Sequence, residues 1–134
     1  MYLLDTDVLS GLRKRQRNPR LMAWIGAQRD ADLYLSAITI AEIERGVIQV
    51  AHANPQFAEE LARWLDRVLD HYGDRVLPFD RSAARRFGAL SARIGNDSPD
   101  LMIAAIALDR GLRVVTRNVR HFVPTGVETV DPFR

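Results

Sequence analysis

Cysteine is absent from this chain of 134 residues. Without it there is no disulfide framework, no zinc–thiolate centre and no cysteine nucleophile. The longest apolar run, within residues 101–108, falls far short of the roughly 18 residues that a membrane-spanning helix requires. The N-terminus lacks the basic start and the small-residue cleavage site of a signal peptide. These absences favour a cytoplasmic protein with no membrane partner.

Charge of either sign is not in large excess, because 19 basic residues face 17 acidic ones and the net charge is only +2. That balance does not by itself indicate a nucleic-acid partner. Lysine is nearly missing: every basic residue except Lys14 is an arginine. A coding bias of the source genome explains such an excess, and so does contact with phosphate or carboxylate groups, for which the planar guanidinium is well suited.

The length and the ordinary composition, 47% hydrophobic and 27% charged, predict a single globular domain over residues 1–134. Short apolar runs predict strands at residues 2–4, 33–36, 75–79, 113–116 and 127–130. Between them, helical spacing and start and stop signals predict helices at residues 7–12, 20–28, 39–53, 55–72, 80–94 and 99–110. Strands separated by helices require crossover connections, so we expect an α/β fold with a parallel sheet covered on both faces.

Polar residues follow the predicted strands where an open parallel sheet binds its ligands. Asp5 ends the first strand, and Thr116 and Asn118 follow the fourth. Glu42 lies early in the helix after the second strand, and Asp100 opens a helix that is apolar almost all round. Carboxylates gathered in one pocket raise one another's pKa, and a divalent cation removes that penalty. Oxygen ligands favour Mg²⁺ or Mn²⁺ over zinc.

Each of these residues also has a purely structural interpretation. Asp5 is a suitable helix cap, and Asp100 in a first helical turn is favoured by the helix dipole. Asn118 is a common turn residue, and Glu42 can be a solvated helix residue. Asp97 is expected in an exposed loop. Spacing alone therefore leaves both a metal site and a set of unrelated structural roles open.

Four segments in order resemble the motifs of PIN-domain ribonucleases, and most closely the VapC- and FitB-like toxins of type II toxin–antitoxin systems. The segments are Leu4-Asp5-Thr6-Asp7-Val8-Leu9-Ser10, Ser36-Ala37-Ile38-Thr39-Ile40-Ala41-Glu42-Ile43-Glu44-Arg45-Gly46, Asp100-Leu101-Met102-Ile103-Ala104-Ala105-Ile106-Ala107 and Thr116-Arg117-Asn118-Val119-Arg120-His121-Phe122. The resemblance implies a three-layer α/β/α sandwich around a parallel sheet of about five strands. It also implies an endoribonuclease that depends on Mg²⁺ or Mn²⁺.

Carried over position by position, the resemblance implies a site in which Asp5 and Asp100 hold the metal. Glu42 and Asn118 would contribute directly or through water, and Thr6 and Thr116 would support the site. Because Asn118 is neutral, the site has three formal charges, which does not favour a tightly held second ion. Many relatives have an acid at the position of His121, which we interpret as a residue on the rim.

The resemblance also implies partners: an RNA substrate, a cognate VapB/FitA-like antitoxin and a second copy of the chain in a homodimer. Assembly with the antitoxin would be larger and would reach promoter DNA only through the antitoxin. The basic residues after the first helix are either a solvated face or a contact for RNA phosphates or antitoxin acids; they are Arg13, Lys14, Arg15 and Arg17.

Other classes of protein are less consistent with the sequence. Neither G-x-x-x-x-G-K-[ST] nor G-x-G-x-x-G occurs, which argues against a nucleotide-binding module. A nuclease for structured DNA would carry additional elements for gripping DNA. The remaining alternative is a degenerate PIN domain that acts as a non-catalytic interaction or regulatory module. Loss of an acid would be its mark, and Asp5, Glu42 and Asp100 are all present.

Overall fold

The computed structural model describes residues 1–14 and 16–134. All five predicted strands are present and pair in parallel: β1 (Tyr2–Leu4), β2 (Leu33–Ser36), β3 (Val76–Leu77), β4 (Arg113–Val115) and β5 (Thr129–Val130). The third strand is shorter than the predicted residues 75–79. Pro78 directly follows it and has no N–H group to donate to a strand ladder, which ends the pairing there.

The strand order β3-β2-β1-β4-β5 places β1 at the centre of the sheet. The chain builds outward from β1 to β3 on one side and then returns to the other side of β1 with β4. Such a reversal opens a crevice at the carboxyl ends of the two strands that flank it. Those ends are joined here, because the Asp5 N–H donates to the carbonyl of Val115 at 2.9 Å.

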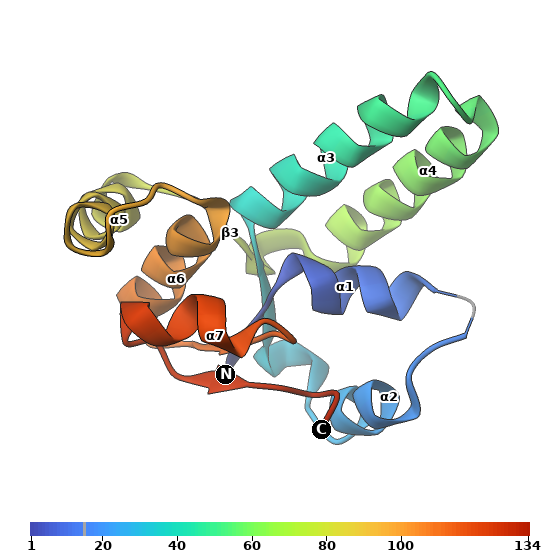
Figure 1. The fold of residues 1–134 in the computed structure, drawn as a ribbon. Coiled ribbons are helices and arrows are strands. Elements are labelled where there is room, and N and C mark those ends of the chain that lie inside the picture. Colours follow the sequence, from blue (N-terminus) through green and yellow to red (C-terminus); the bar gives the residue numbers. More distant parts are fainter. Residues whose placement is uncertain (15) are drawn as a thin grey trace.

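Helices cover both faces of the sheet, as the expected α/β/α sandwich requires (Figure 1). One layer contains α1 (Thr6–Arg13), α2 (Pro19–Gly26), α3 (Ala37–Ala51) and α4 (Pro55–Tyr72). The other contains α5 (Arg81–Ile94), α6 (Pro99–Arg110) and the short α7 (Val119–Phe122). The parallel sheet of five strands between two helical layers confirms the fold predicted from the sequence.

Neighbouring residues of the central strands pack into different layers. Leu3 and Val114 belong to the apolar core under α5, α6 and α7, whereas Leu4 and Val115 belong to the core under α1 to α4. A strand with both faces covered must be apolar at every position, which is why these strands are continuous apolar runs rather than alternating ones. Helix α6 is buried along its middle, from Leu101 to Ala107 apart from Met102, and Asp100 in its first turn is only partly exposed.

Two local features fix where α3 begins. The N–H of Thr39 donates to the Ser36 hydroxyl at 3.1 Å, which caps the helix, and the helix starts at Ala37 rather than at the predicted Thr39. Because Ser36 is the last residue of β2, the helix leaves the sheet at once. Glu42 is therefore held in the second turn of α3, close to the carboxyl edge of the sheet. In the described part of the chain, no helix is both long enough and apolar enough to cross a membrane.

Phe122 anchors α7 to the core and is fully buried. Replacing Phe122 with alanine is expected to lower the free energy of unfolding by about 3–5 kcal/mol, because the large side chain leaves a cavity. Urea unfolding measures the change. Val123→Ala is the matched control, since that neighbouring side chain is 63% exposed and its truncation should change stability by less than about 0.5 kcal/mol. A similar small loss for Phe122→Ala would contradict this assignment of the core.

Candidate metal-dependent nuclease site

Asp5 lies at the point where β1 ends and α1 begins, and it is only 4% exposed. Its Oδ1 accepts a hydrogen bond from the Thr6 N–H at 2.8 Å, and its Oδ2 accepts one from the Thr116 hydroxyl at 2.8 Å. The first contact is a helix cap. The second joins Asp5 to the residue that follows β4, so the side chain is both a cap and part of a polar centre at the strand ends.

The environment of Asp5 opposes its ionisation. Burial is the largest cause, and the nearby charge of Asp7 adds to it, with a smaller contribution from Asp100. The hydrogen bonds from Thr116 and Thr6 act in the opposite direction but are weaker. Together these effects raise the pKa of Asp5 from 3.8 to about 7. A cation beside the carboxylate would favour its charged form and lower this pKa again.

Thr116 is fully buried and links Asp5 to Asn118. Its hydroxyl donates to Asp5 and accepts from the Asn118 N–H at 2.9 Å. Both bonds fix the hydroxyl orientation, which supports the expected role of Thr116 in positioning its neighbours. The Asn118 side chain lies at the N-terminus of α7, and its Nδ2 is 3.4 Å from Oδ2 of Asp7.

Asp7 contacts the same centre, a role that was not predicted from the sequence. Its Oδ2 accepts a hydrogen bond from the Arg117 N–H at 3.2 Å. Its Oδ1 is buried and has no hydrogen-bond partner among the described residues. Burial is the main cause that raises the pKa of Asp7, and the charge of Asp100 adds to it. The signal in the sequence was a second carboxylate two residues after Asp5, which helix-start statistics alone make unremarkable.

A chain of hydroxyls connects Glu42 to the end of β1. The Thr6 hydroxyl donates to Oε1 of Glu42 at 2.7 Å and lies 3.0 Å from the Thr39 hydroxyl. Ser36 continues the chain at 3.3 Å from Thr39. Because a hydroxyl has one proton, the bond from Thr6 to Glu42 leaves Thr39 as the donor to Thr6. Thr6 thus holds the Glu42 carboxylate toward the crevice, as a supporting residue should.

Asp100 approaches from the first turn of α6, and its side chain is 30% exposed. Nδ1 of His121 lies 3.1 Å from its Oδ2, so the residue expected on the rim contacts a proposed metal ligand. Asp100 affects Asp5 and Asp7 through its charge, which raises the pKa of both. Asp97 is exposed in the loop before α6 and has no part in these contacts.

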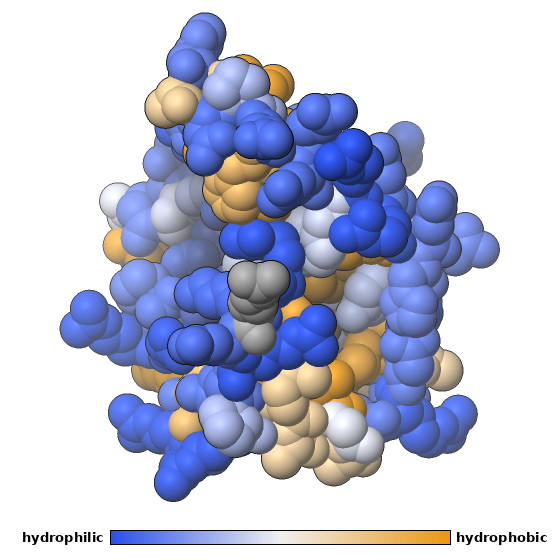
Figure 2. Space-filling model, turned by 90° about the vertical axis from the view of Figure 1, so that its right-hand side faces the viewer, coloured by the Kyte–Doolittle hydropathy of each residue, from blue (hydrophilic) through white to orange (hydrophobic). Residues whose placement is uncertain are grey.

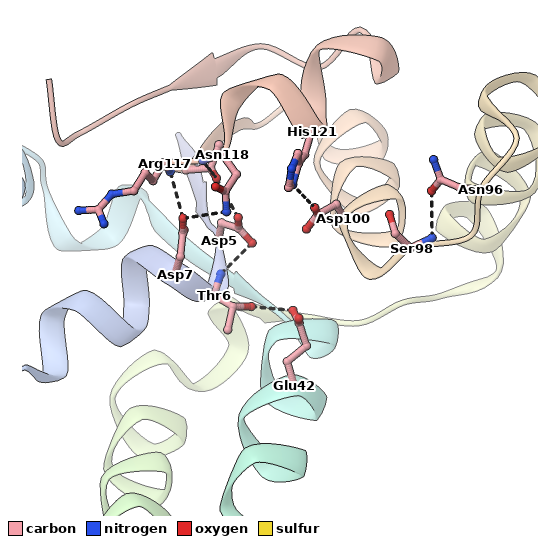
Figure 3. Close-up of polar contacts among 11 residues, drawn as sticks. Asp5, Thr6, Asp7, Glu42, Asn96, Ser98, Asp100, Arg117, Asn118 and His121 are labelled. Atoms are coloured by element: carbon pink, nitrogen blue, oxygen red, sulfur yellow. Dashed lines mark hydrogen bonds and ion pairs between the residues drawn. The ribbon is translucent and has the colours of Figure 1, made fainter. Parts of the chain in front are cut away.

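Figure 3 shows Asp5, Asp7 and Asn118 close together, with the carboxylates of Asp100 on α6 and Glu42 on α3 directed toward them from other parts of the fold. Among the residues that the structure describes, no three His, Asp or Glu side chains form a ready-made metal cluster. The chemistry of the donors nevertheless fits a hard divalent ion, because the side chains offer carboxylate and amide oxygens. One Asp7 oxygen is buried without a hydrogen-bond partner among the described residues, and a nearby cation would favour ionisation of the Asp5 carboxyl.

The predicted basic cluster is divided by the fold. The Arg13 guanidinium lies over the rings of Phe57 and Trp64, 5.2 and 5.9 Å from their centroids, and so is directed toward α4. Lys14 instead borders a hollow that also reaches Asp7. Arg17 lies between the two, because it borders that hollow and also shares a second hollow beside α4 with Arg13 and Glu60. Arg15, the fourth predicted contact residue, lies outside the described residues.

Comparisons with known proteins agree with this architecture. A family model of the PIN domain matches residues 2–124. The VapC ribonuclease Y4jK of Sinorhizobium fredii is 35% identical, over 99% of this chain and 98% of its own length. The toxin FitB of Neisseria gonorrhoeae is 30% identical over 99% of both chains. The crystal structure of FitAcB from Neisseria gonorrhoeae superimposes with a TM-score of 0.88 and 33% identity, covering 100% of this chain and 99% of that one. The chain belongs to the PIN-domain family.

Proposed function

We propose that this protein is a metal-dependent endoribonuclease toxin of a type II toxin–antitoxin system. The observation that carries the proposal is the convergence of Asp5, Asp7, Glu42, Asp100 and Asn118 at the carboxyl ends of β1 and β4, around an Asp5 carboxyl whose pKa is raised to about 7. A buried acid of this kind is an unfavourable feature for a purely structural domain and a useful one for binding a cation. The similarity to a VapC ribonuclease and to the toxin FitB supports the same function.

In the proposed reaction Asp5 and Asp100 hold a divalent cation, Mg²⁺ or Mn²⁺, while Glu42 and Asn118 contribute directly or through water. When bound, the ion lowers the pKa of a water molecule and polarises the phosphate that is cleaved. Thr116 keeps Asp5 aligned through its 2.8 Å hydrogen bond, and Thr6 does the same for Glu42 at 2.7 Å. In-line attack by water leaves a 5′-phosphate and a 3′-hydroxyl without a covalent enzyme intermediate.

The proposed partners follow from the family. We expect a cognate VapB/FitA-like antitoxin to neutralise the activity, a homodimer as the basic assembly, and a larger complex that reaches promoter DNA through the antitoxin. Residues 1–134 would form a single PIN domain, since one sheet carries both apolar cores. A toxin that cleaves cellular RNA acts where that RNA is, which places it in the cytoplasm.

Asp100→Asn is expected to reduce RNA cleavage at least about 100-fold, because it removes a charged metal ligand. The assay uses the purified chain free of antitoxin, end-labelled cellular RNA, and either Mg²⁺, Mn²⁺ or EDTA. Asp97→Asn is the matched control, since this exposed carboxylate lies three residues away and outside the site. End mapping should find a 3′-hydroxyl and a 5′-phosphate at the cleaved bond.

Two results would count against the proposal. Cleavage by Asp100→Asn at the wild-type rate in Mg²⁺ would show that the site is assigned wrongly. A folded wild-type protein that cleaves no RNA with either metal would favour the alternative, a degenerate PIN domain that acts as an interaction module.

A further inference from the structure

A basic hollow opens beside the acidic centre, the group formed by Asp5, Asp7, Glu42 and Asp100. It lies between the end of α1 and the start of α2. Its volume is about 340 Å³, and its lining includes Lys14, Arg17, Arg117, Asp7 and Phe133. We call it the Arg117 hollow. Arg117 follows β4 and is about a hundred residues away from Lys14 and Arg17 in the sequence. The fold therefore assembles a set of cations that no local sequence pattern displays.

The cations of the Arg117 hollow are available for a ligand. No ion pair within 4.0 Å joins Lys14, Arg17 or Arg117 to any other residue that the structure describes. Some other arginines of the chain form ion pairs with its own carboxylates. Arg75, for example, contacts a carboxylate oxygen of Asp30 at 2.8 Å. Hydrophilic side chains cover most of the face of the molecule shown in Figure 2, with smaller apolar patches between them.

Arg117 is held in place before any ligand arrives. Its guanidinium lies 3.8 Å from the centroid of the Phe133 ring, and its backbone N–H donates to Asp7. A cation stacked on an aromatic ring keeps its outward N–H groups free for hydrogen bonds. Fixing the side chain in advance also reduces the entropy lost on binding.

Arg117 also borders a second hollow of about 460 Å³, whose lining includes Asn118, Arg120 and the ion pair of Arg134 with Asp131. One hollow thus reaches the acidic centre at Asp7 and the other reaches it at Asn118, with Arg117 common to both. An RNA strand that binds with one phosphate at the acidic centre would have its neighbouring phosphates near these hollows, because the sugar–phosphate backbone links them at a fixed spacing. An acidic peptide has the same sign of charge but no such fixed spacing from the centre, which favours nucleic acid as the occupant.

We propose that Lys14, Arg17 and Arg117 form a phosphate-binding subsite that holds the RNA backbone next to the bond that is cleaved. The subsite rests on the proposed ribonuclease function and adds to it the residues that bind the substrate. Phe133 is a positioning residue, because it acts only through the Arg117 guanidinium. Phosphate contacts give affinity and register but do not read the sequence, so the subsite should be indifferent to the bases.

Fluorescence anisotropy with a short labelled single-stranded RNA of mixed sequence tests the subsite. Binding is measured in EDTA and in the Asp5→Asn background, where cleavage is blocked and one repelling carboxylate is gone. Arg117→Gln is expected to weaken binding roughly threefold or more and to reduce the slope of log K against log salt by about 0.7, the value for one lost single-strand phosphate contact. Lys14→Gln and Arg17→Gln should each act in the same direction. Phe133→Leu should weaken binding about two- to fivefold while keeping the full slope.

Arg85→Gln is the matched control. Arg85 lines a separate basic hollow with Arg81 and Arg86, near Asp109 at the far end of α6 from Asp100. The Arg85→Gln substitution removes the same charge from the chain as Arg117→Gln. An equal loss of RNA affinity and of salt slope in Arg85→Gln would therefore show a general charge effect and contradict the proposed subsite. Unchanged slopes in Arg117→Gln, Lys14→Gln and Arg17→Gln would overturn it as well, provided that thermal melting shows the variants to be folded.

The failure of the subsite is distinguishable from the failure of the proposed function. If the wild-type chain cleaves RNA with Mg²⁺ while the slopes do not change, the subsite alone is wrong. If the wild-type chain cleaves no RNA with Mg²⁺ or Mn²⁺, the ribonuclease proposal is wrong, and the subsite falls with it.

Discussion

Replacing Asp5 with asparagine is expected to abolish metal-dependent RNA cleavage and to make the metal-free protein more stable at pH 8. Loss of cleavage follows from the loss of a negative charge at the centre of the proposed site, with a reduction of at least about 1,000-fold. The gain in stability follows from the position of Asp5, which is buried and lies near Asp7 and Asp100. Most substitutions of a buried polar side chain do the opposite.

The direction of the pH dependence follows from the raised pKa. Below pH 3.8, the usual pKa of an aspartate, Asp5 is protonated in both the unfolded and the folded chain, and its ionisation does not affect the free energy of unfolding. Between pH 3.8 and about 7 the unfolded chain ionises first, so stability is lost as the pH rises. Above about pH 7 the loss of stability is complete, and the raised pKa of Asp5 has then lowered the free energy of unfolding by roughly 4 kcal/mol. Asparagine does not ionise and so avoids this cost.

One contact offsets part of the gain. The Thr116 hydroxyl donates to Asp5 at 2.8 Å. In the variant it would face the NH₂ group of asparagine and lose its acceptor, at a cost of about 1 kcal/mol. A net gain of about 3 kcal/mol at pH 8 is therefore expected, and it should shrink steadily toward pH 4.

Urea unfolding in EDTA at several pH values measures this difference. Adding Mg²⁺ at pH 8 should stabilise the wild-type protein much more than Asp5→Asn, because the variant lacks one of the two carboxylates that are proposed to hold the ion. Asp97→Asn, at an exposed site, should show neither effect. A variant that is less stable than the wild type at pH 8 would contradict the prediction, since it would show that the hydrogen bond from Thr116 outweighs the cost of burying the Asp5 charge.

The parts of the site that were predictable from sequence are those that strand ends determine. Asp5 and Thr116 lie at the ends of short apolar runs that predict strands, and parallel strands bring their carboxyl ends to one edge. The structure places these two residues in direct contact at 2.8 Å. Asp100 was noticeable because a carboxylate at the mouth of an apolar helix is unusual.

The parts that were not predictable depend on contacts between distant segments. Asp7 joins the site through Arg117 and Asn118, both about 110 residues later in the chain. Arg13 and Lys14 are neighbours in sequence, yet one packs on α4 and the other borders the acidic centre. Sequence spacing along α1 gives no indication of which partner each side chain meets, since that depends on the packing of α1 against α4 and against the segment after β4.

Asp7→Asn is expected to weaken the binding of Mg²⁺ about 10- to 100-fold and to raise the Mg²⁺ concentration needed for half-maximal cleavage by a similar factor. Asp7 supplies a fourth carboxylate to a centre whose Asn118 is neutral. In the part of the chain that the structure describes, its buried Oδ1 has no hydrogen-bond partner, while Oδ2 accepts from the Arg117 N–H at 3.2 Å. Asparagine can keep the bond to Arg117 through its oxygen, so the fold should survive while the charge is lost.

Moving the charge rather than deleting it separates an electrostatic role from a structural one. Nδ2 of Asn118 lies 3.4 Å from Oδ2 of Asp7, so Asn118→Asp in the Asp7→Asn background exchanges the two side-chain types across one contact. The exchanged variant should recover most of the Mg²⁺ affinity, measured by calorimetry and by thermal stabilisation as well as by cleavage. If Asp7→Asn needs no more Mg²⁺ than the wild type, Asp7 has no role in metal binding and serves only as an acidic residue in the first turn of α1. If the exchange restores nothing although the variant is folded, the position of the carboxylate matters more than the total charge of the centre.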